Sequence, residues 1–201
     1  MALLTKTQQK LDRWIAIMQS CDTLGFLTTS QIQRLHALSG RRNTLRVLND
    51  MGDYLNSFHE GELVWYLSAK GRKEIGSETV RKRTPLVQHT VIRNEVCVTY
   101  RPELFKTEYS VKWDGKELVA DAIMRKNGVY TFIEIDLTQS FGANERKMAA
   151  YRELRDSGKW TVKYGAFPTL LFVTMSEHRR QKLRAIVGDL KSEILTFNDL
   201  I

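Results

Sequence analysis

Residues 27–52 read LTTSQIQRLHALSGRRNTLRVLNDMG, and this stretch decides the fold of the first half of the chain. The Thr-Thr-Ser run at 28–30 supplies N-cap residues for a short helix. The Ser39-Gly40 pair then breaks that helix, and Asn43 or Thr44 can cap another one. Two short helices separated by a tight break are typical of a helix-turn-helix.

The residues on either side extend this motif into a complete small domain. Apolar residues at helical spacing predict an earlier helix over 6–19. Aromatic and β-favouring residues over 54–58 and 63–67 predict a hairpin, and Ser68 can cap a further helical turn over 69–75. We therefore predict a winged helix-turn-helix over residues 1–77, in which the hairpin is the wing.

The second half predicts a different domain. Residues 78–85 are basic, lack apolar periodicity and are expected to form a linker. Over 86–201 we expect, in order, a helix at 86–100, strands at 109–113, 118–124 and 129–137, a helix at 144–155, a strand at 170–174, a helix at 177–191 and a strand at 194–197. This order indicates a mixed sheet flanked by helices, so the whole chain is expected to be α+β with an α/β second domain.

Charge and composition narrow the function classes. The chain of 201 residues carries 31 Lys and Arg against 23 Asp and Glu, a net charge of +8, which favours a polyanionic partner such as nucleic acid. There is no secretory leader and no run of 18 apolar residues, so we expect a cytoplasmic protein without a membrane partner. Cys21 and Cys97 lie far apart, which argues against a zinc site or a disulfide framework.

The basic residues of the first domain lie where a helix-turn-helix meets DNA. The N-terminal part of its second helix enters the major groove, where side chains contact base edges and phosphates. The residues expected there are Arg41, Arg42, Asn43, Thr44 and Arg46, and those expected to contact phosphates after the wing are Lys70, Arg72 and Lys73. His59 lies at the wing turn. The alternative is a winged helix that contacts another protein.

Three carboxylates stand inside apolar strands of the second domain. Glu134 and Asp136 share one face of a strand, and Asp121 can join them across the hairpin. Buried carboxylates are costly unless a cation compensates them, and three oxygen ligands suit Mg²⁺ or Mn²⁺. Lys147 and Tyr151, four residues apart on a helix, face the same way, and Lys147 could stabilise charge during phosphodiester hydrolysis.

These residues also permit a plain structural interpretation. In it, Asp121, Glu134 and Asp136 lie on a solvated face of the sheet and pair with nearby cations. The candidate cations are Lys147, Arg146 and Arg125. Structural ion pairs produce the same composition as a catalytic cluster, so both interpretations stay open.

The whole chain resembles the replication-relaxation proteins of bacterial plasmids, phages and integrative elements. The resemblance rests on LTTSQI at 27–32, VWYLSAKGR at 64–72, His89, VAD at 119–121, FIEID at 132–136 and KMAAY at 147–151. It implies a winged helix joined to a core similar to the PD-(D/E)xK nucleases. Ala120 stands where the nuclease motif has proline, and Asp136 stands where it has the catalytic lysine. Lys147 could substitute, and His89 and Glu95 could approach the same cleft.

The leading hypothesis is a DNA-binding factor of a plasmid or phage that acts in replication, relaxation or transcriptional control, with an inactive nuclease-like domain. A second is a Mg²⁺- or Mn²⁺-dependent endonuclease or nickase in which Asp121, Glu134, Asp136 and Lys147 are catalytic. A third is a module that recruits a helicase or relaxase. The expected partners are double-stranded DNA, replication or relaxation proteins, and a second copy in a homodimer.

Overall fold

The computed structural model describes residues 5–201, which form a mixed α+β protein of two compact units. The boundary between the units falls at Asn94, inside helix α5 (Val87–Tyr100). The basic stretch 78–85, expected as a linker, lies within the first unit. The first part of α5 belongs to that unit because the Asn94 side chain donates hydrogen bonds to the carbonyls of Leu24 and Phe26, at 2.9 and 2.8 Å.

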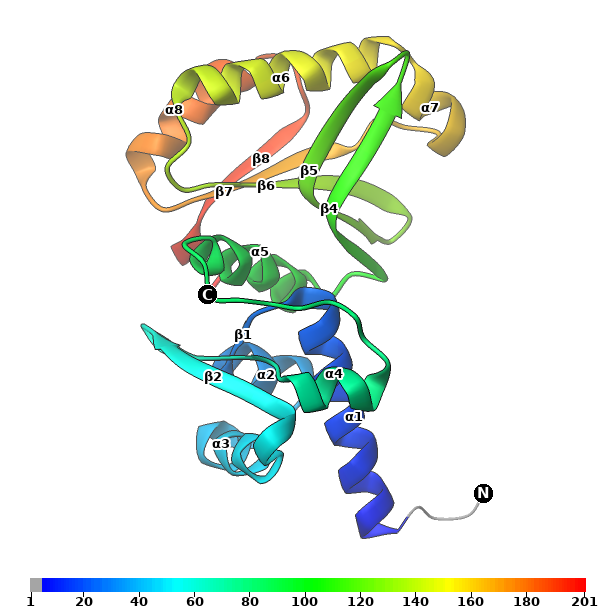
Figure 1. The fold of residues 1–201 in the computed structure, drawn as a ribbon. Helices are drawn as coiled ribbons and strands as arrows, with labels where there is room; N and C mark the ends of the chain where they lie inside the picture. Colours follow the sequence, from blue (N-terminus) through cyan, green and yellow to red (C-terminus); the bar gives the residue numbers. More distant parts are fainter. Residues whose placement is uncertain (1–4) are drawn as a thin grey trace. The chain divides into compact units, whose positions relative to one another are not determined.

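The N-terminal unit has three helices followed by a hairpin and a short helix (Figure 1). Its elements are α1 (Lys6–Leu24), β1 (Leu27–Thr28), α2 (Thr29–Leu35), α3 (Gly40–Asp50), a 3₁₀ turn (Gly52–Tyr54), β2 (Leu55–Glu60), β3 (Glu62–Leu67) and α4 (Ala69–Ile75). The three strands form an antiparallel sheet in the order β1-β3-β2. The order of helices and the hairpin agrees with the sequence prediction, although α1 is longer than expected.

Local signals explain where α2 begins. The Thr28 hydroxyl accepts a hydrogen bond from the amide of Gln31, and the Gln31 side chain accepts one from the amide of Thr28. This capping box satisfies two amides that would otherwise lack partners at the start of the helix. Glu62 adds to the same end by accepting hydrogen bonds from the amide and hydroxyl of Ser30. The hairpin therefore fixes the start of α2.

The start of α3 differs from the sequence prediction. The N-cap is Ser39, so Asn43 and Thr44 lie inside the helix rather than at its cap. Thr44 is fully buried because it shares the apolar face of α3 with Val47 and Leu48. Its hydroxyl donates to the carbonyl of Gly40 at 3.0 Å. The expectation that Thr44 contacts DNA is therefore wrong, since its side chain does not reach the surface.

The C-terminal unit contains a five-stranded mixed sheet in the order β4-β5-β6-β7-β8. Its elements after α5 are β4 (Leu104–Trp113), β5 (Lys116–Lys126), β6 (Val129–Asp136), α6 (Phe141–Asp156), α7 (Lys159–Tyr164), β7 (Thr169–Thr174), α8 (Glu177–Val187), β8 (Ser192–Thr196) and a 3₁₀ turn (Phe197–Asp199). The pairs β4-β5 and β5-β6 are antiparallel, whereas β6-β7 and β7-β8 are parallel. Among the helices and strands of this unit, α7 has no counterpart in the predicted order, and neither does the final 3₁₀ turn.

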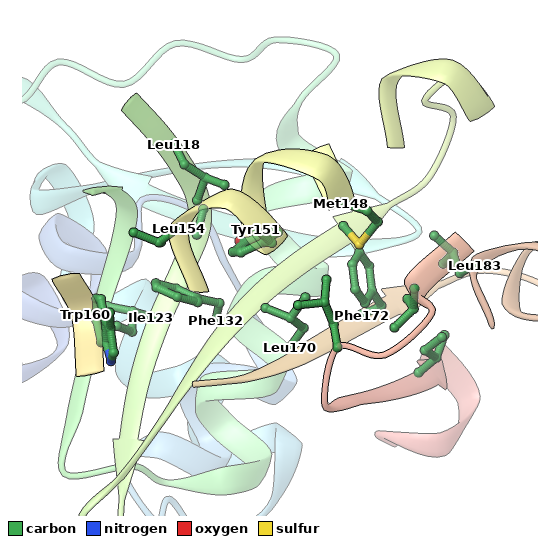
Figure 2. Packing of buried hydrophobic residues seen from close by; sticks show 14 of the residues in the cluster. Leu118, Ile123, Phe132, Met148, Tyr151, Leu154, Trp160, Leu170, Phe172 and Leu183 are labelled. Carbon is green, nitrogen blue, oxygen red and sulfur yellow. The ribbon is translucent and has the colours of Figure 1, made fainter. Parts of the chain in front are cut away.

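One face of this sheet carries the main apolar core (Figure 2). Helix α6 contributes Met148, Tyr151 and Leu154, and α8 contributes Leu183. These side chains pack on strand residues that include Phe132, Phe172 and Leu170, all at most 2% exposed. The core therefore fixes α6 over β6, the strand that carries the carboxylates.

The strands β4, β5 and β6 are joined by tight turns of the kind that the sequence predicts. Asn127 and Gly128 both have positive φ angles, as do Asp114 and Gly115. Two consecutive positive φ angles are the requirement of the type I′ hairpin turn, which Asn-Gly and Asp-Gly satisfy at the least cost. Within residues 5–201, no helix combines the length and apolar character that a membrane span requires.

Candidate nucleic-acid interface and carboxylate cluster

The outer face of α3 is polar and basic. Arg42, Arg46 and Asn49 are exposed and follow one another at helical spacing, while Thr44, Val47 and Leu48 are buried on the opposite face. Arg46 donates a hydrogen bond to the side chain of Asn43 at 2.9 Å. Three side chains that can contact bases or phosphates therefore form a stripe along the helix. The sequence did not point to Asn49 because the basic residues cluster at the start of the helix, whereas Asn49 lies near its end.

Arg41 and Arg42 differ in their surroundings. Arg41 forms an ion pair with Glu62 on β3, so its guanidinium is directed to the hairpin. Across residues 5–201, Arg42 has neither an ion pair nor a hydrogen bond through its side chain. An exposed, unpaired guanidinium is available to an anionic ligand without breaking an existing contact.

The basic residues of α4 are less uniform than the sequence suggests. Lys70 lies over the ring of Tyr54, 4.8 Å from its centroid, and pairs with Asp53 at 3.4 Å. Lys73 is exposed, whereas Arg72 is half-buried. The sequence also missed Arg83 of the basic stretch 78–85, which pairs with Glu60 on β2 at 2.7 Å. No sequence periodicity links Arg83 to the hairpin, so only the structure could find it.

In the C-terminal unit, two of the predicted carboxylates face α6. Glu134 accepts hydrogen bonds from both Lys147 and Tyr151, as their four-residue spacing on α6 predicts. Asp136 accepts one from Asn144 at 3.0 Å. Glu134 and Asp136, two residues apart on β6, therefore face successive turns of α6. Both carboxylates are buried: Glu134 is 4% exposed and Asp136 is 2% exposed.

Asp121 lies on β5 beside this pair and plays a different role. Its carboxylate accepts a hydrogen bond from the backbone amide of Ile135 at 2.7 Å. The regular pairing of β5 with β6 ends at Ala122 and Ile133. The Asp121 side chain thus takes the place of a strand-to-strand hydrogen bond where the two strands separate.

Burial dominates the electrostatics of Glu134. The pKa of this carboxyl is raised from its ordinary value of 4.5 to about 8, mainly because burial desolvates it, and the nearby charge of Asp121 contributes to the rise. The charge of Lys147 and the hydrogen bonds from Lys147 and Tyr151 act in the opposite direction. Burial and the neighbouring Glu134 likewise raise the pKa of the Tyr151 hydroxyl.

Asp136 is held by a cation that the sequence did not reveal. Arg179 on α8 donates hydrogen bonds to both of its carboxylate oxygens, each at 2.7 Å, and another to the carbonyl of Gln139 at 2.8 Å. Arg146 and Arg125 had been considered as partners, but Arg125 pairs with Glu103. The long separation in sequence between Asp136 and Arg179 hid this contact. The expected pairing of Glu134 with Lys147 is therefore confirmed, whereas the expectation that these carboxylates lie on a solvated face is wrong for Glu134 and Asp136, which are buried, while Asp121 is half-buried.

The residues present do not fit the predicted divalent-metal site. Lys147 and Tyr151 engage Glu134, whereas Arg179 and Asn144 engage Asp136. In the part of the chain that the structure describes, no three His, Cys, Asp or Glu side chains are grouped so that they could hold a metal ion. The cavity beside Glu134 and Asp136 measures about 70 Å³. The arrangement therefore ties β6 to α6 and α8.

His89 and Glu95 both lie on α5, as the sequence suggests. His89 is half-buried and belongs to the N-terminal unit, whereas Glu95 is buried and belongs to the C-terminal unit. The hydroxyl of Thr99 donates a hydrogen bond to Glu95 at 3.4 Å. The two residues therefore belong to different units.

The chain is similar to one known protein family and to a solved structure. Residues 18–170 match the sequence profile of the family described as Replication-relaxation. No curated protein is significantly similar to the chain. Among solved structures, the chain is similar to protein VC1899 from Vibrio cholerae, with a TM-score of 0.38 and 10% sequence identity. The alignment covers 96% of this chain and 50% of that one, so the chain spans half the length of the structure it matches.

Proposed function

The chain belongs to the replication-relaxation family, and from this premise we propose that its N-terminal unit binds double-stranded DNA of a plasmid or phage. The family description supports a role in the replication of mobile elements. The order of three helices and an antiparallel hairpin supports a winged helix-turn-helix, in which α3 enters the major groove and β2-β3 form the wing.

The observation that carries this proposal is the exposed stripe of Arg42, Arg46 and Asn49 on α3. Arginine pairs with guanine through two hydrogen bonds, and asparagine pairs with adenine in the same way. Lys73 on α4 and Arg41 beside the hairpin would add phosphate contacts, which position the protein without reading sequence. The net charge of +8 favours the same partner.

We also propose that the C-terminal unit supports DNA binding without cutting DNA. In this proposal Glu134 and Asp136 are structural residues, because Lys147 and Tyr151 already bind Glu134 and Arg179 already pairs with Asp136. Plasmid DNA incubated with the protein and Mg²⁺ or Mn²⁺ should therefore remain supercoiled. Metal-dependent nicking that disappears in Glu134→Ala would instead establish the endonuclease.

The test of DNA binding compares two variants of α3 with a matched control. Arg42→Ala and Arg46→Ala each remove one exposed arginine from the stripe, and Arg184→Ala removes one from α8, where the side chain is 58% exposed. Fluorescence anisotropy with a labelled DNA duplex measures the affinity. We expect each α3 variant to bind about tenfold more weakly, since one good base contact contributes about 1–3 kcal/mol, and the control to bind like the wild type. Equal affinities for all four proteins would contradict the proposal.

A further inference from the structure

A second candidate binding site lies in the C-terminal unit, between the edge strand β4 and the short helix α7. It is a cavity of about 160 Å³. Its walls include Tyr109 and Lys112 from β4 and Lys159, Trp160, Lys163 and Tyr164 from α7. None of these residues contributes to the carboxylate cluster or to α3. The site combines aromatic rings with lysines, so it suits a ligand that has both a planar ring and a negative charge.

The aromatic rings that line the cavity belong to a larger packed group of rings. The ring centroids of Trp160 and Tyr164 are 4.4 Å apart with planes inclined by 36°, and Tyr130 lies 5.3 Å from Tyr164. Trp160 is only 3% exposed and lies at one end of the apolar core in Figure 2. Tyr109 and Tyr164 are half-buried, so part of each ring is open to a ligand. A planar ligand can stack on such a surface.

Three lysines surround these rings. Lys163 lies 5.2 Å from the centroid of the Tyr164 ring. Lys159 pairs with Asp114 at 3.3 Å, and these two side chains are 61% and 57% exposed. Lys112 is 75% exposed and has its carboxylate partner at 3.8 Å. Exposed ion pairs of this kind contribute little to stability, so the ammonium groups can turn to an anionic ligand at low cost.

Trp160 adds an unsatisfied polar group. Its indole N–H is buried and has no hydrogen-bond partner among residues 5–201. Buried donors without partners are uncommon in folded proteins because desolvation is costly. Because Trp160 is among the residues that line the cavity, this unpaired donor lies in the wall of the candidate site.

We propose that this cavity binds one nucleotide unit of single-stranded nucleic acid, with the base on Tyr164 and the phosphate beside Lys163 and Lys159. Its volume of about 160 Å³ is below the roughly 300 Å³ at which pockets for drug-sized ligands begin, so it suits one ring system. Aromatic stacking combined with lysine contacts to phosphate is how proteins bind single strands without sequence preference. A free nucleotide carries the same chemistry, and the experiment separates the two sources. The proposal is independent of duplex binding by α3.

The experiment uses the whole chain of 201 residues carrying Arg42→Ala and Arg46→Ala, so that α3 contributes as little as possible. Anisotropy of a fluorescein-labelled twelve-residue oligothymidylate measures strand binding, and unlabelled dTMP serves as competitor. Tyr164→Ala removes the stacking ring, and Lys163→Ala removes the cation over it. Lys182→Ala is the matched control, because Lys182 also lies over an aromatic ring, 4.8 Å from the centroid of Phe141, but outside the cavity.

We expect Tyr164→Ala to weaken strand binding about tenfold and Lys163→Ala a few-fold, with Lys182→Ala unchanged. Thermal unfolding checks that each variant is folded, and Lys163→Glu carries the test if Tyr164→Ala is not. Displacement by dTMP at concentrations similar to those of the oligomer would identify the free nucleotide as the ligand, and displacement by the oligomer alone would identify the strand. Binding that is absent, or lost equally in Lys163→Ala and Lys182→Ala, would overturn the proposal.

Discussion

Replacing Arg179 by Ala removes the cation that holds Asp136 in the interior. Arg179 supplies two hydrogen bonds of 2.7 Å to a carboxylate that is 2% exposed, and only the Asn144 amide would remain. Removing one partner of a buried ion pair costs about 3–5 kcal/mol. Because the Arg179 side chain is 23% exposed, water can reach the vacated position, and we expect the lower end, about 3 kcal/mol. For a unit of this size, that corresponds to a Tm lower by at least 10 °C.

Urea unfolding followed by circular dichroism measures this loss. Arg184→Ala, on the same helix, is the control, and we expect it to change stability by less than about 0.5 kcal/mol because its carboxylate partner is 3.9 Å away and exposed. The double variant Asp136→Ala, Arg179→Ala should lose less than the sum of the two single losses, since it leaves no unpaired charge. Additive losses, or an Arg179→Ala variant as stable as the wild type, would refute the ion pair as a structural tie.

Three further predictions concern single residues. Glu134→Gln should flatten the pH dependence of stability. The folded state holds the Glu134 proton up to about pH 8 but the unfolded state only to about pH 4.5, so the stability of the wild type falls as the pH rises across this window, by up to about 1.4 kcal/mol per pH unit. Urea midpoints at pH 5, 6.5 and 8 that fall equally in both proteins would disprove this. Gly71→Ala should destabilise the N-terminal unit by about 2 kcal/mol or more in thermal unfolding, because the added methyl group would clash with the backbone carbonyl of Tyr54. An unchanged Tm would show that this contact relaxes freely. Thr28→Ala should cost about 1 kcal/mol of stability through loss of the capping box with Gln31, whereas Thr28→Ser should restore most of it.

The sequence predicts most elements because their signals are local. Thr28 and Ser68 cap the helices that they were expected to begin, and Asn127-Gly128 forms its hairpin turn. The six-residue helix α7 was not predicted because it is too short to show a helical period. The start of α3 was misplaced because Thr44 has a capping side chain but occupies a buried position. Tertiary burial outweighed a local preference there.

The candidate sites were predictable only as far as contacts follow helical or strand spacing. The approach of Lys147 and Tyr151 to Glu134 follows from four-residue spacing on one helix. The Arg179 contact with Asp136 joins β6 to α8 and depends on how the sheet and helices pack, which no short-range pattern encodes. The same limit applies to the ion pair of Arg83 with Glu60. The pairing of Lys147 with Glu134 and of Arg179 with Asp136 is what favours a structural role for these carboxylates over a metal site.

The most direct test of DNA binding by α3 is the salt dependence of duplex affinity. Each phosphate contact contributes about 0.9 to the slope of log K against log salt concentration. If Arg42 and Arg46 both lie on the DNA, the variant lacking both should bind more weakly, with a slope smaller by up to about two, while Arg184→Ala should keep the wild-type slope. An unchanged affinity and slope in the α3 variant would contradict the account, because duplex DNA would then be bound elsewhere.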